Sequence, residues 1–279
     1  LPFWAGVVVA AGVAFTSSLV GQGYNMGTDL PQAALLFAGL WAWRKGRLPD
    51  AGLLLGFSAC FKPLGLVAYG LLGLYVLCTR PKRLLVGKWL LSYVLVGVTL
   101  LRIFIATGMP VFPMPFLEFY PMPAWGMSES AAGGLYAEMT RGRPSVPMTL
   151  PGLADFAVRF FIAPKSVYSC RWFSPLFGVA VLLWGAMWLF RGTRGRIMDQ
   201  IKQGAAAPLA ASVILLVFWL LMKPQFRYGA GLWIYLYVFF VTSAWFGLGR
   251  WMRTGFVVIA ACWALMFSAY HVSKAVRII

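Results

Sequence analysis

The chain has 279 residues, of which 61% are hydrophobic and 11% are charged, and its formal net charge is +17 at pH 7. Because a soluble domain carries about 25% charged residues, this composition excludes an ordinary soluble domain and a disordered chain. The bases lie mostly in short stretches between apolar runs, so the positive charge does not indicate a nucleic-acid partner. We expect an all-α, polytopic integral membrane helical bundle.

Apolar runs close to the length that crosses a bilayer predict about nine membrane-crossing segments. In the first part of the chain we expect helices at residues 1–20, 30–43, 51–77 and 89–107. The third run is too long for one crossing and is interrupted by Phe61-Lys62-Pro63. Since Pro63 cannot extend a helix without the loss of a backbone hydrogen bond, we predict a broken pair of short helices within 51–78.

Residues 108–172 are predicted to form a Pro-rich loop, which separates the helices of 1–107 from those of 173–279. Within this loop, Ala154–Ile162 has an apolar face broken by Asp155 and Arg159, which is typical of a helix lying in the membrane interface. Further membrane helices are expected at 173–190, 206–222, 229–248 and 255–269.

The distribution of bases predicts the orientation. The loops 44–50, 79–88, 191–203 and 249–253 contain more than half of the 24 Lys and Arg residues, and such loops lie on the cytoplasmic side. All four share one side only if 51–78 runs out and back as two short helices that meet near Lys62, as a pair that either crosses fully or is re-entrant. Asp29 and the Pro-rich loop then face the non-cytoplasmic side, whereas Asp50 and Asp199 remain inside.

Two kinds of charged residue are site candidates at the outer helix ends. Asp29 opens a helix, where a carboxylate either caps the free N–H groups or serves as a base or metal ligand. The cations at these ends are Lys62, Arg102, Lys223 and Arg227. Arg binds a phosphate through two hydrogen bonds and Lys binds it as a point charge. Snorkelling to the interface is the alternative interpretation of such cations.

Arg102 lies within an apolar stretch, where a charge is costly and indicates function. We predict that Asp29, Lys62 and Arg102 converge in one outward-facing cavity. The four cysteines form no CxxC pair and the single His271 has no ligand partner at helical spacing, so neither predicts a metal site. No nucleotide-binding motif is present.

Three stretches resemble polytopic GT-C glycosyltransferases, the class that includes protein O-mannosyltransferases and the lipid A aminoarabinose transferase. They are Gly27-Thr28-Asp29-Leu30-Pro31, then Ala51–Phe57 followed by Lys62-Pro63, and Gly108–Pro113. The resemblance covers roughly residues 15–125. The later helices are similar only in topology and in the turn Pro224–Arg227.

The resemblance implies transfer of a sugar from a polyprenyl-phosphate donor to an acceptor on the non-cytoplasmic side of a bacterial inner membrane. Asp29 would be the catalytic residue, while Arg102, Lys62, Arg227 and Lys223 would bind the phosphate, sometimes with a divalent metal. The membrane lipid and the polyprenyl-phosphate-linked sugar are the expected partners.

One departure from the family leaves other interpretations open. The first outer loop of such enzymes and its acidic pair are absent, so Asp29 matches only a secondary acid, and we expect the N-terminal part of a longer protein to be missing. The alternatives to an enzyme are a non-catalytic accessory subunit of a larger complex, whose protein partners are unknown, and a lipid or small-molecule transporter. A transporter would use the broken pair near Lys62 as its site.

Overall fold

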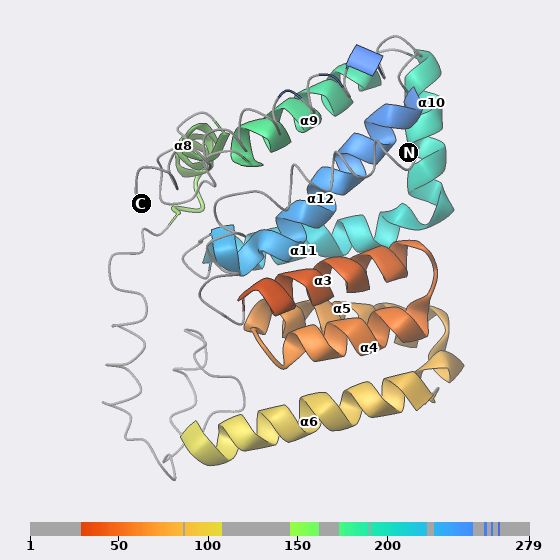
Figure 1. Cartoon of the computed structure of the whole chain (residues 1–279), viewed down its shortest axis with the longest axis vertical. Coiled ribbons are helices and arrows are strands. Elements are labelled where there is room, and N and C mark those ends of the chain that lie inside the picture. Colours follow the sequence, from red (N-terminus) through yellow and green to blue (C-terminus); the bar gives the residue numbers. More distant parts are fainter. Residues whose placement is uncertain are drawn as a thin grey trace, which may run out of the picture. The chain divides into compact units, whose positions relative to one another are not determined.

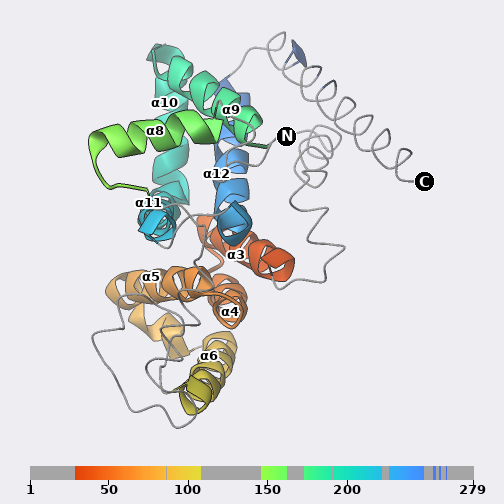
Figure 2. The same cartoon turned by 90° about the vertical axis from the view of Figure 1, so that its left-hand side faces the viewer.

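A computed structural model of the chain describes residues 29–85, 87–107, 146–161, 173–189, 191–221 and 226–247, together with 254, 255, 258 and 262. Every regular element in these residues is helical (Figures 1 and 2), so the all-α prediction is confirmed for the described part of the chain. The predicted helix at 1–20, nearly all of that at 255–269 and most of the Pro-rich loop lie outside it.

The helices form two compact units. The α3–α6 unit contains α3 (Asp29–Arg44), α4 (Leu48–Ala59), α5 (Pro63–Thr79), the 3-10 helix η1 (Pro81–Leu85), α6 (Gly87–Thr107), α11 (Ala206–Leu221) and the start of α12 (Phe226–Gly247), as far as Leu232. The α8–α10 unit contains α8 (Leu150–Phe161), α9 (Phe173–Trp188), α10 (Arg191–Gln200) and α12 from Trp233 onward.

In the α3–α6 unit, α3, α4 and α5 lie side by side in alternating directions, and α6 lies against α4 (Figures 1 and 2). Short turns cause the reversals. After α3, Gly46 adopts a positive φ of 71°. The Gly46 N–H donates to the carbonyl oxygen of Trp43 at 2.8 Å, and the Arg47 N–H donates to the carbonyl oxygen of Ala42 at 3.0 Å. This is a Schellman motif, which satisfies the last carbonyls of the helix.

The predicted break in 51–78 is present between Ala59 and Pro63. Lys62 is extended, with φ −149° and ψ 148°, because a residue before proline avoids the helical region. Pro63 then opens α5, where its missing N–H costs no helical hydrogen bond. The N–H of Gly65 bonds the carbonyl of Lys62 at 3.0 Å, so the new helix is anchored at the break.

Small residues bring the helices of this unit unusually close. A Cβ added to Gly52 or Gly56 of α4 would lie 2.6 Å from the Trp89 ring or 2.7 Å from Cβ of Ser92 on α6. A Cβ on Gly65 of α5 would lie 2.4 Å from the backbone of Ser58 on α4. Two glycines spaced four apart on one helix face, with close backbone approach, are typical of helix packing in membranes.

One helix in the described residues, over Gly87–Ile105 of α6, is long and apolar enough to cross a membrane, with a mean hydropathy of 1.7. Only 17% of this window is buried, whereas the core helix of a soluble protein is mostly buried. Its outward face carries the exposed side chains of Leu90, Val94, Val98 and Leu101. Shorter apolar helices are present in both units, among them Pro63–Thr79, Ala206–Leu221 and Phe177–Trp188.

Aromatic rings hold the α8–α10 unit together. Phe160 of α8 stacks on Trp233 of α12 with ring centroids 4.5 Å apart, and Phe177 of α9 meets the same Trp233 edge-on at 5.2 Å. The helix predicted around Ala154–Ile162 is present as α8, although it begins at Leu150 rather than Ala154, and its place at a membrane interface stays a prediction. Its two charges, Asp155 and Arg159, form an exposed ion pair at 2.8 Å.

Residues 191–203, predicted from their charge to be a loop, are mostly helical instead. They form α10 and the start of a π-helical turn at Ile201–Ala205. Ile197 is buried with Met187 and packs with Trp184 and Trp188. This small apolar edge stabilises a helix whose overall composition is strongly polar, and charge alone therefore gave the wrong element.

Candidate functional site

Four of the five predicted site residues belong to one end of the α3–α6 unit, which we call the Lys62 end. There α3 begins, α4 gives way to α5, α6 and α11 end, and α12 begins (Figure 1). Asp29, Lys62, Arg102 and Arg227 lie on these helix ends, and Lys223 lies outside the described residues. At the opposite Asp50 end, α3 turns into α4 and α5 leads through η1 into α6.

Helix register places three of these residues at one level. The Ser58 hydroxyl donates to the backbone oxygen of Gln32 at 3.4 Å, so α3 and α4 are level there. Asp29 lies three residues before Gln32, so it is about 4.5 Å farther along α3 toward the Lys62 end. This places Asp29 near the level of Lys62. Close packing of Gly231 on Ala33 aligns α12 with α3, and Arg227 precedes Gly231 by as many residues as Asp29 precedes Ala33.

Arg102 lies farther out than Lys62. The Cys60 thiol contacts the backbone oxygen of Leu95 at 3.7 Å, which sets α4 and α6 level at this point. Arg102 follows Leu95 by seven residues and is therefore about 10 Å beyond the level of Cys60. The cause is length, because α6 has 21 residues and α4 only 12, and α6 extends past its neighbours (Figure 1). The Arg102 side chain is exposed.

The predicted convergence is thus a shared level for Asp29, Lys62 and Arg227, with Arg102 outside it. That these residues line one cavity stays a prediction. Lys62 is half-buried at the break. The Lys62 backbone is fixed there by the following Pro63 and by the hydrogen bonds that the Lys62 carbonyl oxygen accepts from the next helix.

Gln32 is a polar residue of the Lys62 end that the sequence analysis missed. Its side chain is 0% exposed, and neither amide atom has a hydrogen-bond partner within the described structure. An unsatisfied buried polar group costs about 1–3 kcal/mol, and such groups in native proteins call for an explanation. An amide one helical turn after Asp29, within an apolar run, was the available sequence signal.

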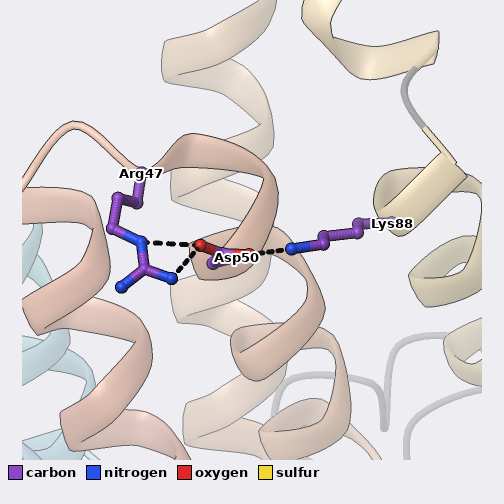
Figure 3. A network of polar contacts seen from close by, with 3 residues as sticks. All are labelled: Arg47, Asp50 and Lys88. Atoms are coloured by element: carbon purple, nitrogen blue, oxygen red, sulfur yellow. Dashed lines mark hydrogen bonds and ion pairs between the residues drawn. The ribbon is translucent and has the colours of Figure 1, made fainter.

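The Asp50 end contains the best-defined ionic network (Figure 3). Arg47 Nε donates to Asp50 Oδ2 at 2.7 Å, and Lys88 Nζ donates to Asp50 Oδ1. The hydrogen bond from Lys88, followed by that from Arg47, lowers the pKa of Asp50 from its ordinary value. Asp50 therefore links the first turn of α4 to the first turn of α6. No sequence signal indicated this pair, because 38 residues separate its members.

The divalent metal implied by the resemblance is not matched by the described residues at the Lys62 end. Divalent metals of this kind prefer several carboxylate or carbonyl oxygens. Asp29 is the sole carboxylate among the described residues there and is accompanied by cations. Across the described part of the chain no group of three His, Cys, Asp or Glu residues is arranged to bind a metal ion.

No protein-family model matches the chain. Likewise, no curated protein and no solved structure matches it.

Proposed function

We propose that the chain is a multi-pass protein of a bacterial inner membrane. The support is the apolar surface, which on α6, α5 and α11 includes Val94, Val98, Leu74, Val213 and Val217. Exposure of apolar area to water costs about 25 cal/mol per Å², and lipid removes this cost. The close glycine contacts between α4, α5 and α6 agree with this environment.

Within that membrane protein, we propose a glycosyltransferase site at the Lys62 end that takes a polyprenyl-phosphate-linked sugar. The observation that carries the proposal is the shared level of Asp29, Lys62 and Arg227. Two cations and one carboxylate at this level would provide both phosphate binding and a base. Arg102, farther out along α6, would meet the lipid phosphate as it enters.

The proposed reaction uses these groups as follows. The Asp29 carboxylate accepts the proton of an acceptor hydroxyl, whose oxygen attacks the anomeric carbon of the sugar. The bond from that carbon to the phosphate oxygen breaks, and polyprenyl phosphate leaves with the electron pair. Lys62 and Arg227 stabilise the negative charge on this leaving group. The buried amide of Gln32 supplies donors and acceptors for sugar hydroxyl groups.

Binding of polyprenyl phosphate to the chain in phosphatidylcholine nanodiscs tests the site. Lys62→Gln and Arg227→Gln should each weaken binding about tenfold, the effect of 1.4 kcal/mol. Arg102→Lys keeps the charge but loses the bidentate contact, so it should bind less well than wild type and better than Arg102→Ala. Arg194→Gln, which removes an exposed cation of the α8–α10 unit, is the matched control and should not change binding.

Equal affinity of all these variants would reject the phosphate site and favour the accessory-subunit interpretation. Asp29→Asn separates the two roles, because it should abolish sugar transfer while lipid-phosphate binding is retained. If turnover is present in wild type and unchanged in Asp29→Asn, Asp29 only caps α3.

A further inference from the structure

The Asp50 end of the α3–α6 unit carries a concentration of positive charge that the proposed sugar transfer does not use. Its cations come from the α3–α4 turn, the α5–η1 turn and the start of α6: Arg44, Lys45, Arg47, Arg80, Lys82 and Lys88. We call this set the basic surface. The described residues of the unit include only two carboxylates, and one of them, Asp29, lies at the other end.

Side-chain contacts hold the three segments of the basic surface together. Asp50 pairs with Arg47 of the first segment and Lys88 of the third (Figure 3). The Trp43 and Tyr75 rings, 5.4 Å apart, join the ends of α3 and α5, and η1 contacts α4, α5 and α6. The surface is therefore built by the fold and is not a set of independent loops.

Five of the six cations remain open to solvent despite these contacts, and Arg44 is half-buried. Lys88 is 55% exposed and Arg47 69% exposed as side chains, and Lys45, Arg80 and Lys82 are also exposed. Among the described residues of this unit, Asp50 is the one carboxylate at this end, and it pairs with Arg47 and Lys88. Lys45, Arg80 and Lys82 add positive charge that this carboxylate does not balance. The surface therefore attracts a further anion.

We infer that the basic surface binds the headgroup of an anionic glycerophospholipid, with an acyl chain along the outward face of α6. Charge complementarity supplies the first part of the argument, because phosphate groups attract Lys and Arg near a membrane. The second part is continuity. The exposed side chains of Leu90, Leu91, Val94 and Val98 follow Lys88 along the same helix.

This continuity favours a lipid over a free phosphate or a nucleic acid. Either of those ligands would contact the cations alone and would not contact the adjoining apolar face. A phospholipid covers both at once. Trp41, whose ring centroid lies 5.0 Å from the Arg44 guanidinium and 5.4 Å from the Lys45 ammonium, is typical of side chains at the headgroup level. The inference rests on the membrane location proposed above and not on sugar transfer.

The test measures retention of phosphatidylglycerol. The full chain is extracted from nanodiscs that contain equal amounts of phosphatidylglycerol and phosphatidylcholine, and bound lipid is counted by native mass spectrometry. Wild type should retain phosphatidylglycerol selectively. Lys82→Gln/Lys88→Gln should reduce its affinity roughly 30-fold, because each base near a lipid surface contributes about fivefold.

The matched control is Arg194→Gln/Lys202→Gln, which removes the same charge from exposed positions of the α8–α10 unit and should leave selective retention unchanged. Lys82→Gln alone leaves the Asp50 pairs in place and should still cost about fivefold, so a folding defect of the double variant does not spoil the test. Equal losses in both double variants, or displacement of the lipid by millimolar inorganic phosphate, would overturn the inference. Polyprenyl-phosphate binding should be unchanged in all these variants, which separates this site from the Lys62 end.

Discussion

The two ends of the α3–α6 unit use polar groups in opposite ways. At the Asp50 end, one carboxylate receives hydrogen bonds from Arg47 and Lys88 and ties two helices together. At the Lys62 end, the helices are held by backbone packing at Gly65 and Gly231, while the amide of Gln32 is buried without a described partner. Satisfied polar groups stabilise a fold, whereas an unsatisfied one indicates a missing ligand or water.

This difference also orders the effects expected from substitutions. Backbone contacts cannot relax, so changes there should be severe. Removal of the buried Gln32 amide should have an intermediate effect and should raise the stability of the protein rather than lower it. An ion pair open to solvent contributes little.

The largest effect is expected for Gly65→Val. The added Cβ would lie 2.4 Å from the backbone carbon and oxygen of Ser58, and neither helix can move away without breaking the α4–α5 contact. We expect a loss of about 3 kcal/mol or more in the free energy of unfolding, measured in detergent by tryptophan fluorescence during denaturant unfolding.

Gly70→Ala is the control for this change on the same helix. An added Cβ at Gly70 meets nothing within 4 Å, so the substitution should stabilise α5 by up to about 1 kcal/mol through helix propensity. Similar stability of the Gly65 and Gly70 variants would show that α4 and α5 do not approach closely at this end.

Local sequence signals predicted most helices and the break between them. Apolar runs gave the positions of α6, α9 and α11 to within a few residues, and Pro63 gave the end of the first short helix. These signals are local, since length, hydrophobicity and backbone chemistry act within a few residues. The missed helix α10 depends on the packing of Ile197 against Trp184 and Trp188, which is a tertiary effect.

The relative levels of the site residues could not be predicted in the same way. Lys62, Arg102 and Asp29 all lie near helix ends in the sequence, but helix lengths and register separate Arg102 from the others. Register depends on contacts such as Ser58 with Gln32 and Asp50 with Lys88, across 26 and 38 residues. Sequence spacing contains no information on such pairs.

An intermediate effect is expected for Gln32→Met, which keeps the side-chain volume and removes the buried amide. The ligand-free protein should become more stable by about 1 kcal/mol, because the unsatisfied group no longer has to be desolvated. Binding of a polyprenyl-phosphate-linked sugar should weaken at the same time. Denaturant unfolding and nanodisc binding of the same preparations measure the two effects.

Ser212→Ala is the counterpart of this change at a satisfied buried group. The Ser212 hydroxyl donates to the carbonyl of Pro208 at 2.7 Å, so its removal should destabilise by about 1 kcal/mol and leave binding unchanged. Destabilisation by Gln32→Met as well would mean that the amide already has a partner, and the Lys62 end would lose that support for a ligand site.

A small effect is expected for Asp50→Asn, and its size depends on pH. The pKa of Asp50 in the folded chain is lower than its ordinary value of 3.8, so the unfolded chain binds the proton more readily. The stabilisation from Asp50 is therefore complete above the ordinary pKa and is lost as the pH falls from there through the lowered value. Because both cations are largely exposed, the difference from wild type at pH 7 should be below about 1 kcal/mol and should shrink in high salt.

Asp155→Asn shows whether it matters that Asp50 connects two helices. Asp155 also pairs with a cation, Arg159 at 2.8 Å, but both lie on α8 and are 58% exposed. Loss of that pair removes only a contact within one helix, worth about 0.5 kcal/mol at most. Asp50→Asn should in addition loosen the start of α6, which is measured as faster amide exchange near Lys88 at pH 7 in the variant than in wild type. This difference in exchange rate should vanish when the two proteins are compared at acidic pH. Equal exchange at pH 7 in wild type and Asp50→Asn would mean that backbone packing also fixes the Asp50 end, and the contrast between the two ends would then be one of charge alone.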